Sequence, residues 1–244
     1  MNELASQTLA QIVTGNHRTA SVFEKYHLDF CCKGKRSLEK ACADQNISVD
    51  ELLAELESAA HTNQSNFPFD KLSLSQLAEY IVANHHAYVK KESPQLLAYA
   101  EKVTFKHGEH HPELNKILKA VTTIKEEMEQ HMHKEETVLF PRIQELEKFS
   151  KDEHRDTKLN VSYLQASITL MVQEHDQAGL LQAEIRQLSN NYTPPQDACT
   201  TYKLLFAGLE AFEADLHQHV HLENNILFPK SIELFSNITA AECN

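Results

Sequence analysis

One short pattern occurs twice in this chain, and its polar residues are of the types that bind metal ions. The first copy, His-Met-His-Lys-Glu-Glu-Thr-Val-Leu-Phe-Pro, begins at His131, and the second, His-Val-His-Leu-Glu-Asn-Asn-Ile-Leu-Phe-Pro, begins at His219. Residues four positions apart share a helix face, so His131 should lie beside Glu135 and His219 beside Glu223. One such pair is typical of a solvated polar face. Two copies, both on the apolar stripe of their segments, favour metal ligation.

Each pair needs further ligands, and each is preceded at a similar distance by another histidine. His175 precedes the second copy, and either His85 or His86 precedes the first. Both His85 and His86 fall on the apolar stripe, although the spacing of the repeat slightly favours His86. This duplication predicts a site in which each half supplies one histidine from its first helix and a His-x-x-x-Glu pair from its second.

The predicted donor set contains four imidazoles and two carboxylates, which is the composition of a dinuclear metal centre. Two carboxylates shared between two cations would offset the repulsion between them. Structural zinc sites prefer four ligands and often thiolate, whereas mixed nitrogen and oxygen donors favour iron or manganese. The expected occupant is a pair of iron ions, with manganese as the less favoured alternative.

The elements that must position these residues are helical. Apolar residues recur at alternating spacings of four and three, and no segment alternates with the period of a strand. Four long amphipathic segments are predicted, at about 73–92, 110–148, 154–190 and 198–236. The sequence therefore predicts an all-α fold, in which an antiparallel four-helix bundle follows a small helical domain.

The domain boundaries follow from composition. Residues 1–62 read as the small helical domain and residues 73–244 as the bundle. The polar, proline-containing stretch 63–72 between them is predicted to be a linker.

Bulk composition restricts the partners and the compartment. The 244 residues are 41% hydrophobic and carry a formal net charge of −12, which argues against nucleic acid or an anionic membrane surface as a partner. The sequence shows neither a targeting segment nor an apolar run long enough to span a membrane. Its five cysteines form no spaced framework, so we expect reduced thiols in the cytoplasm.

Several residues near the repeated pattern are assigned to supporting roles. Three histidines are predicted on the outer face of the bundle: His133, His217 and His221. Two acidic residues are expected either to hold a ligand histidine from behind or to lie at the surface: Glu127 and Glu174. The Phe-Pro pair that ends each copy is predicted to pack and to kink its helix.

A separate feature is the adjacent pair Cys31 and Cys32. Neighbouring cysteines close a disulfide only with strain, so a structural bridge is not expected. The cations Lys33, Lys35 and Arg36 are predicted to lower the pKa of these thiols and make them reactive. The pair is interpreted as a redox or metal-handling site, against the alternative of two incidental residues in a turn.

These motifs together resemble the iron–sulfur cluster repair di-iron proteins, also called the ScdA/YtfE type. The resemblance runs almost end to end. It covers Leu-Asp-Phe-Cys-Cys-Lys-Gly around Cys31, Glu-His-Asp-x-Ala-Gly around His175, the loop 191–201, and both His-x-x-x-Glu-x-x-x-Leu-Phe-Pro blocks. It implies a hemerythrin-like bundle, an N-terminal domain bearing the double cysteine, and cytoplasmic homodimers.

The same resemblance implies a non-haem, oxo- or hydroxo-bridged di-iron centre. Carried onto this chain, its ligands are the six residues His86, His131, Glu135, His175, His219 and Glu223. His86 is preferred because it falls at the ligand position of the family. Two weaker candidates are His85 and His107, the latter because relatives have a histidine near the metal site there.

The family implies repair of iron–sulfur clusters damaged by oxidative or nitrosative stress. The predicted activity is donation of iron to damaged iron–sulfur proteins, which makes the chain a repair factor rather than a turnover enzyme. The alternative is a di-iron protein that binds or reduces nitric oxide or dioxygen.

Overall fold

The computed structural model describes residues 3–60, 67–152 and 163–242, and they are all-α. Within those ranges no residue belongs to a strand, and Thr8 and Ser37 form an isolated antiparallel bridge. The chain divides into two compact units, one of residues 79–216 and the other of residues 1–78 with 217–244. None of the helices in the described ranges is long and apolar enough to cross a membrane. The predicted all-α bundle is confirmed.

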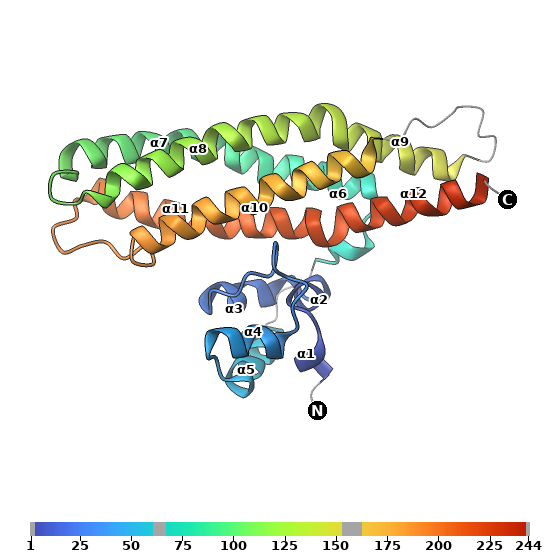
Figure 1. Cartoon of the computed structure of the whole chain (residues 1–244), viewed down its shortest axis with the longest axis horizontal. Helices are drawn as coiled ribbons and strands as arrows, with labels where there is room; N and C mark the ends of the chain where they lie inside the picture. The colour runs from blue at the N-terminus through green and yellow to red at the C-terminus, as the bar shows by residue number, and fades with distance from the viewer. Residues whose placement is uncertain (1–2, 61–66, 153–162, 243–244) are drawn as a thin grey trace. The chain divides into compact units, whose positions relative to one another are not determined.

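The unit of residues 79–216 contains long antiparallel helices (Figure 1). Helix α8 packs against both α7 and α10. Their bounds are α7 (Ala87–His107), α8 (Glu113–Lys134), η4 (Glu135–Leu139), α9 (Phe140–Lys151), α10 (Leu164–Leu188) and α11 (Thr200–Leu222). Apolar side chains at helical spacing, including Leu96, Ile117, Ile124 and Leu209, fill the space between them.

The first long helix extends further than the sequence predicts. It begins with α6 (Leu74–Ile81) and η3 (Val82–His86), and α7 then continues to His107 with Pro94 inside it. Proline removes one backbone donor from a helix. The buried stripe nevertheless continues on both sides of Pro94, through Val89 and Val103, so packing maintains the helix.

Three of the long helices contain a five-residue π-helical turn: η3, η4 and η5 (Glu223–Leu227). In η4 the N–H of Phe140 reaches the carbonyl of Glu135, and in η5 the N–H of Phe228 reaches that of Glu223. Both phenylalanines are buried, which confirms the predicted packing for the phenylalanine of each Phe-Pro pair, whereas Pro229 is exposed. Single π turns are rare and often mark functional sites.

The second unit contains the small N-terminal helices and the C-terminal helix α12 (Phe228–Glu242). The short helices are α1 (Glu3–Ser6), α2 (Leu9–Gly15), η1 (His17–Thr19), α3 (Ala20–Lys25), α4 (Leu38–Gln45), α5 (Val49–Ala60) and η2 (Phe69–Lys71). Their core includes Leu9, Phe23, Phe30, Leu38 and Leu52. The predicted linker 63–72 includes η2, and its residues 63–66 lie outside the described residues. The boundaries at 62 and 73 stay predictions.

Candidate metal centre

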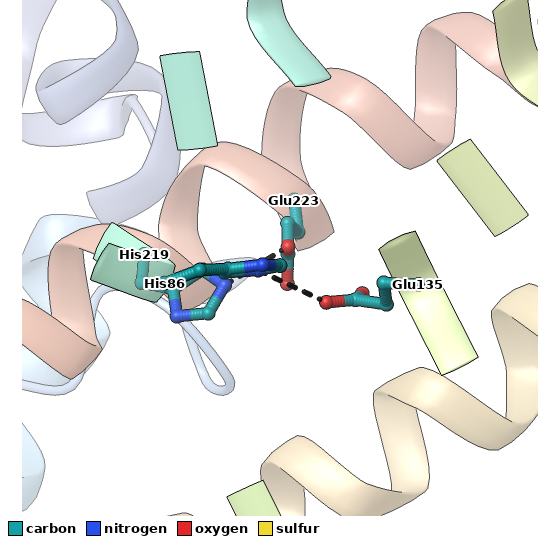
Figure 2. Close-up of side chains that lie close together, drawn as sticks. All are labelled: His86, Glu135, His219 and Glu223. Atoms are coloured by element: carbon teal, nitrogen blue, oxygen red, sulfur yellow. Dashed lines mark hydrogen bonds and ion pairs between the residues drawn. The ribbon is translucent and has the colours of Figure 1, made fainter. Parts of the chain in front are cut away.

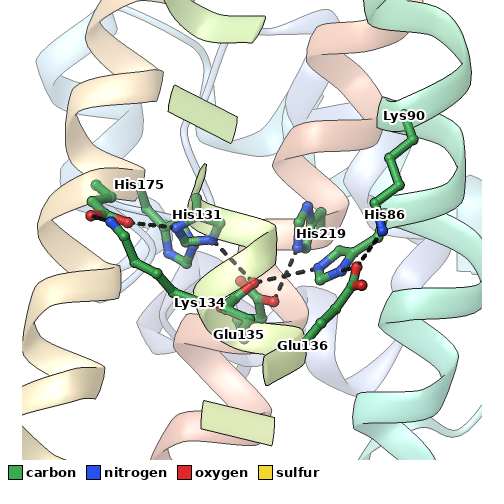
Figure 3. Close-up of polar contacts among 10 residues, drawn as sticks. His86, Lys90, His131, Lys134, Glu135, Glu136, His175 and His219 are labelled. Atoms are coloured by element: carbon green, nitrogen blue, oxygen red, sulfur yellow. Dashed lines mark hydrogen bonds and ion pairs between the residues drawn. The ribbon is translucent and has the colours of Figure 1, made fainter. Parts of the chain in front are cut away.

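The centre of the site is a carboxylate with no solvent exposure. Glu135, the first residue of η4, is fully buried. One of its oxygens, Oε2, lies 3.2 Å from Nε2 of His131 and 3.4 Å from Nε2 of His86. His131 Nε2 in turn lies 3.1 Å from Nε2 of His175. The helical segments that carry His86, His131 and His175 thus direct three imidazole nitrogens toward one place (Figure 3).

A second buried pair repeats this arrangement at the end of α11. His219 and Glu223 are both fully buried, and Nε2 of the histidine lies 3.0 Å from Oε1 of the glutamate. The four-residue spacing across the junction of α11 and η5 brings the two side chains together, as helical geometry requires.

The six predicted ligands form two overlapping groups. One consists of His86, Glu135, His219 and Glu223 (Figure 2), and the other of His131, Glu135, His175 and Glu223. Within each group, one potential ligand atom from every residue lies within 4.8 Å of the others. Both carboxylates belong to both groups, as residues that bridge two ions would.

Two of the imidazoles are held from behind by carboxylates. Nδ1 of His86 lies 2.8 Å from Oε1 of Glu136, to which Lys90 also donates at 2.6 Å. A ring whose Nδ1–H donates to a carboxylate keeps the lone pair of Nε2 available for a metal ion. Although burial opposes it, the hydrogen bonds from Lys90 and His86 lower the pKa of Glu136.

The same device recurs on the next helix. Nδ1 of His131 lies 2.9 Å from Oε2 of Glu174, whose other oxygen accepts from Lys134. The hydrogen bond from His131, helped by Lys134, lowers the pKa of Glu174 to about 2. Of the two roles left open for Glu174, the structure shows support of a histidine. Glu136 and the two lysines were not predicted, because no spacing rule marks a contact between different helices.

The donor set fits a pair of divalent cations. Buried carboxylates are costly unless a positive charge or hydrogen bonds compensate them. Glu135 and Glu223 contribute two negative charges, and neutral imidazoles contribute nitrogen ligands without further charge. Oxygen and nitrogen donors without thiolate favour iron or manganese over a structural zinc.

The two weaker ligand candidates lie outside both groups. His85 is buried, but its Nδ1 lies 3.0 Å from Oδ1 of Asp215. His107 lies with Nε2 3.3 Å from the sulfur of Cys199 and its ring against Tyr202. The structure therefore brings neither histidine to the carboxylates of the cluster.

Of the three histidines predicted on the outer face, His133 is exposed, whereas His221 is buried. His221 is 1% exposed, its ring lies 5.6 Å from that of Phe30, and burial lowers its pKa to about 4. His217, on the same face, is half-buried and pairs with Glu24 at 2.7 Å. Helical periodicity correctly predicts that this face points away from the bundle core, but it does not show that the N-terminal helices cover the face.

The predicted lowering of the thiol pKa is wrong for Cys31. The hydrogen bond with Cys32, burial, and the nearby carboxylate of Asp29 all raise the pKa of Cys31 well above its ordinary value. The neighbouring cation Lys33 is exposed and does not reverse this effect. Both thiols are free, with their sulfurs 3.8 Å apart.

Comparison with known proteins identifies first the class and then the family. Residues 77–231 match the family model described as the hemerythrin HHE cation-binding domain, which defines the bundle as a domain of that class. Residues 5–60 match the ScdA_N model, which is described as a domain of unknown function.

Two relatives cover nearly the whole chain. An iron–sulfur cluster repair protein YtfE of Yersinia pestis (strain Pestoides F) is 34% identical over 227 residues, which is 93% of this chain and 97% of the relative. The protein of the same name from Yersinia pseudotuberculosis serotype O:1b (strain IP 31758) is 33% identical over the same shares. The chain belongs to the iron–sulfur cluster repair protein family.

Proposed function

We propose that the two overlapping groups hold two iron ions, with Glu135 and Glu223 as the shared ligands. His86 and His219 complete one set, and His131 and His175 complete the other. The support is that both carboxylates belong to both donor groups, because carboxylates shared in this way would offset part of the repulsion between two adjacent cations. Iron bound here would supply exchangeable ferrous ions.

The function of the chain, on this proposal, is repair of damaged iron–sulfur clusters by iron donation. The observation that carries it is the buried cluster built only of imidazole and carboxylate donors. Ferrous iron ranks low in affinity among the divalent first-row metals, and the cluster lacks the thiolates that hold soft metals firmly. Such a site is suited to releasing iron to a client whose ligands are thiolates. The family membership supports the same conclusion.

A cavity gives the cluster a route for exchange. It has a volume of about 320 Å³, is partly open to solvent, and lies between α8 and α10. His131 and Glu174 line it, together with Lys134, Gln130 and Gln177. Lys134 and Glu174 both border the cavity, and Glu174 holds His131 while it accepts from Lys134. Movement of this pair would therefore free a ligand ring beside the cavity.

The direct test is iron transfer. The iron-loaded protein is mixed anaerobically with an iron–sulfur enzyme whose cluster has been damaged by nitric oxide, and recovery of client activity is followed with isotopically labelled iron. We expect label in the client and restored activity. The Glu135→Leu variant is the matched control and should restore neither. If free ferrous iron at the same concentration restores client activity as well as the iron-loaded protein does, the proposal of iron donation by this protein is wrong.

Reduction of nitric oxide is the second candidate, favoured by the same cavity. Its volume of about 320 Å³ is large enough to hold a diatomic molecule beside His131. Anaerobic turnover of nitric oxide to nitrous oxide by the reduced protein, with an electron donor in excess, would support this activity. Iron transfer without nitrous oxide would leave donation as the function.

We also propose that the chain acts in the cytoplasm as a homodimer on damaged iron–sulfur proteins. The proposal rests on the family resemblance. Sedimentation equilibrium of the full chain should give twice the monomer mass, and a monomer at micromolar concentration would contradict it.

A further inference from the structure

Outside the bundle cluster, one other group of potential ligands in the described residues lies in the turn between α3 and α4. Asp29, Cys31 and Cys32 each offer a ligand atom, and these atoms lie within 4.8 Å of one another. The proposed di-iron site uses none of them. Two sulfurs and a carboxylate oxygen have a different chemistry from the bundle cluster, because thiolate is a soft ligand.

Hydrogen bonds from backbone amides to the carboxylate of Asp29 stabilise this turn. Oδ1 of Asp29 accepts the amide hydrogens of Cys31, Cys32 and Lys33 at 3.1, 2.9 and 3.2 Å. At Gly34, a Cβ atom would lie 2.1 Å from the carbonyl oxygen of Phe30, so the chain approaches itself too closely for a side chain. The carboxylate thus organises the loop that presents the thiols.

The spacing of the thiols matches that of two ligands on one ion. Their sulfurs lie 3.8 Å apart. Two thiolates at about 2.3 Å from a tetrahedral ion stand roughly 3.8 Å from each other. The pair can therefore chelate a cation without a large change in the turn.

We propose that Asp29, Cys31 and Cys32 form a separate ferrous-iron site through which iron passes on its way to a client. This inference rests on the proposed function and adds the step of transfer. Binding replaces two S–H bonds by two Fe–S bonds and releases two protons to solvent, with no change in the oxidation state of iron. Handing on the ion exchanges each Fe–S bond for one to a client thiolate, and each cysteine regains a proton.

The site is suited to transient binding. Three donors leave at least one position of a tetrahedral ion open, and a client thiolate can enter there. Cys31 is buried, whereas Cys32 is partly exposed and gives an incoming ligand access.

The turn also lies against the helix that carries a bundle ligand. The side-chain N–H of Asn225 donates to the carbonyl oxygen of Cys31 at 3.1 Å, and Asn225 belongs to η5, the segment that begins with Glu223. The π-helical turn η5 therefore contacts the backbone of the cysteine site through Asn225 and also carries Glu223, a proposed ligand of the di-iron site.

The test counts ions and identifies their ligands. The full chain, with its bundle iron loaded, is equilibrated anaerobically with ferrous ion under reducing conditions. We expect one more ferrous ion per chain in the wild type than in the Cys31→Ser/Cys32→Ser double variant. Cobalt(II) in place of the added iron should give a sulfur-to-metal charge-transfer band in the wild type and no such band in the double variant.

Two single variants complete the test, one as a control and one as an independent probe of the site. Cys199→Ser removes a partly exposed thiol elsewhere and should keep both the extra ion and the band. Asp29→Asn keeps an oxygen that can accept the three amide hydrogens but removes the charge, so it should weaken binding at least tenfold without unfolding the turn. Its affinity for ferrous ion tests the site even if the double variant folds poorly.

The outcomes separate this site from the di-iron proposal. Equal ion counts with no sulfur band in the wild type, or unchanged affinity in Asp29→Asn, would overturn the cysteine site. Loss of iron from the bundle with a persistent cysteine-dependent ion would instead overturn the di-iron proposal.

Discussion

Two buried carboxylates of the bundle, Glu213 and Glu135, have different kinds of partner. Glu213 accepts from the guanidinium of Arg186 at 2.6 Å and from the hydroxyl of Tyr192 at 2.9 Å. Glu135 instead faces the Nε2 atoms of His86 and His131. A guanidinium is always charged and cannot bind a metal ion, whereas a neutral imidazole carries a lone pair that can. The partner therefore decides whether a buried carboxylate neutralises a charge of the chain or stays available to a metal ion.

The largest effect is expected from removing a shared carboxylate of the metal cluster. Glu135→Leu or Glu223→Leu should lower bound iron well below two per chain, because each residue belongs to both donor groups. Elemental analysis of the purified variants measures this. Glu210→Leu, a change at an exposed carboxylate, is the control. Full retention of iron in Glu135→Leu would contradict the bridging assignment.

Next in size is the effect of breaking the Arg186–Glu213 pair, which should alter stability rather than metal content. Glu213→Leu leaves a largely buried guanidinium uncompensated, at a cost of about 3 kcal/mol in the free energy of unfolding. Denaturant unfolding of metal-free protein measures this cost. Adding Arg186→Met should recover much of the loss. A Glu213→Leu variant with the unfolding free energy of the wild type but no bound iron would contradict this distinction, because it would show that Glu213 serves metal binding rather than stability.

A smaller effect is expected where a carboxylate supports a ligand from behind. Glu174→Gln removes the charged acceptor of the His131 Nδ1–H and should weaken iron binding roughly tenfold to a hundredfold. Competition against a chelator gives the affinity. Glu127→Gln, at the same cavity but away from that ring contact, should bind as the wild type does. Equal affinities for the two variants would show that Glu174 does not tune the site.

The smallest effect belongs to the surface pair of His111 and Asp197. The hydrogen bond with Asp197 raises the pKa of His111 above 6.5, and that with His111 lowers the pKa of Asp197 below 3.8. The stabilisation that protonated His111 contributes is fully present below the ordinary pKa of histidine and is lost as the pH rises through the raised pKa of His111. Asp197→Asn should therefore destabilise the protein more at about pH 5.5 than at about pH 9. A pH-independent difference in unfolding free energy would contradict this.

Helical periodicity was sufficient to predict the fold class and which residues share a helix face. It placed His131 beside Glu135 and His219 beside Glu223, as the structure has them. It could not show what covers each face, so the burial of His221 by the N-terminal helices was missed. It also ended the first helix before Pro94, because local propensity carries no information about the packing that maintains the helix.

The supporting contacts were harder still to predict. Glu136 holds His86 across two helices, and the order of residues along one helix does not reveal such a partner. The π-helical turns beginning at Glu135 and Glu223 were equally hidden, because a single wider turn does not alter the apolar spacing around it enough to be recognised.

The central claim is that the buried imidazole and carboxylate cluster is a di-iron site. Iron stoichiometry combined with electronic absorption on the purified full chain tests it most directly. We predict two iron ions per chain, with a spectrum of nitrogen- and oxygen-ligated iron that disappears in Glu135→Leu. A single ion per chain, or two irons with an unchanged spectrum in that variant, would contradict it.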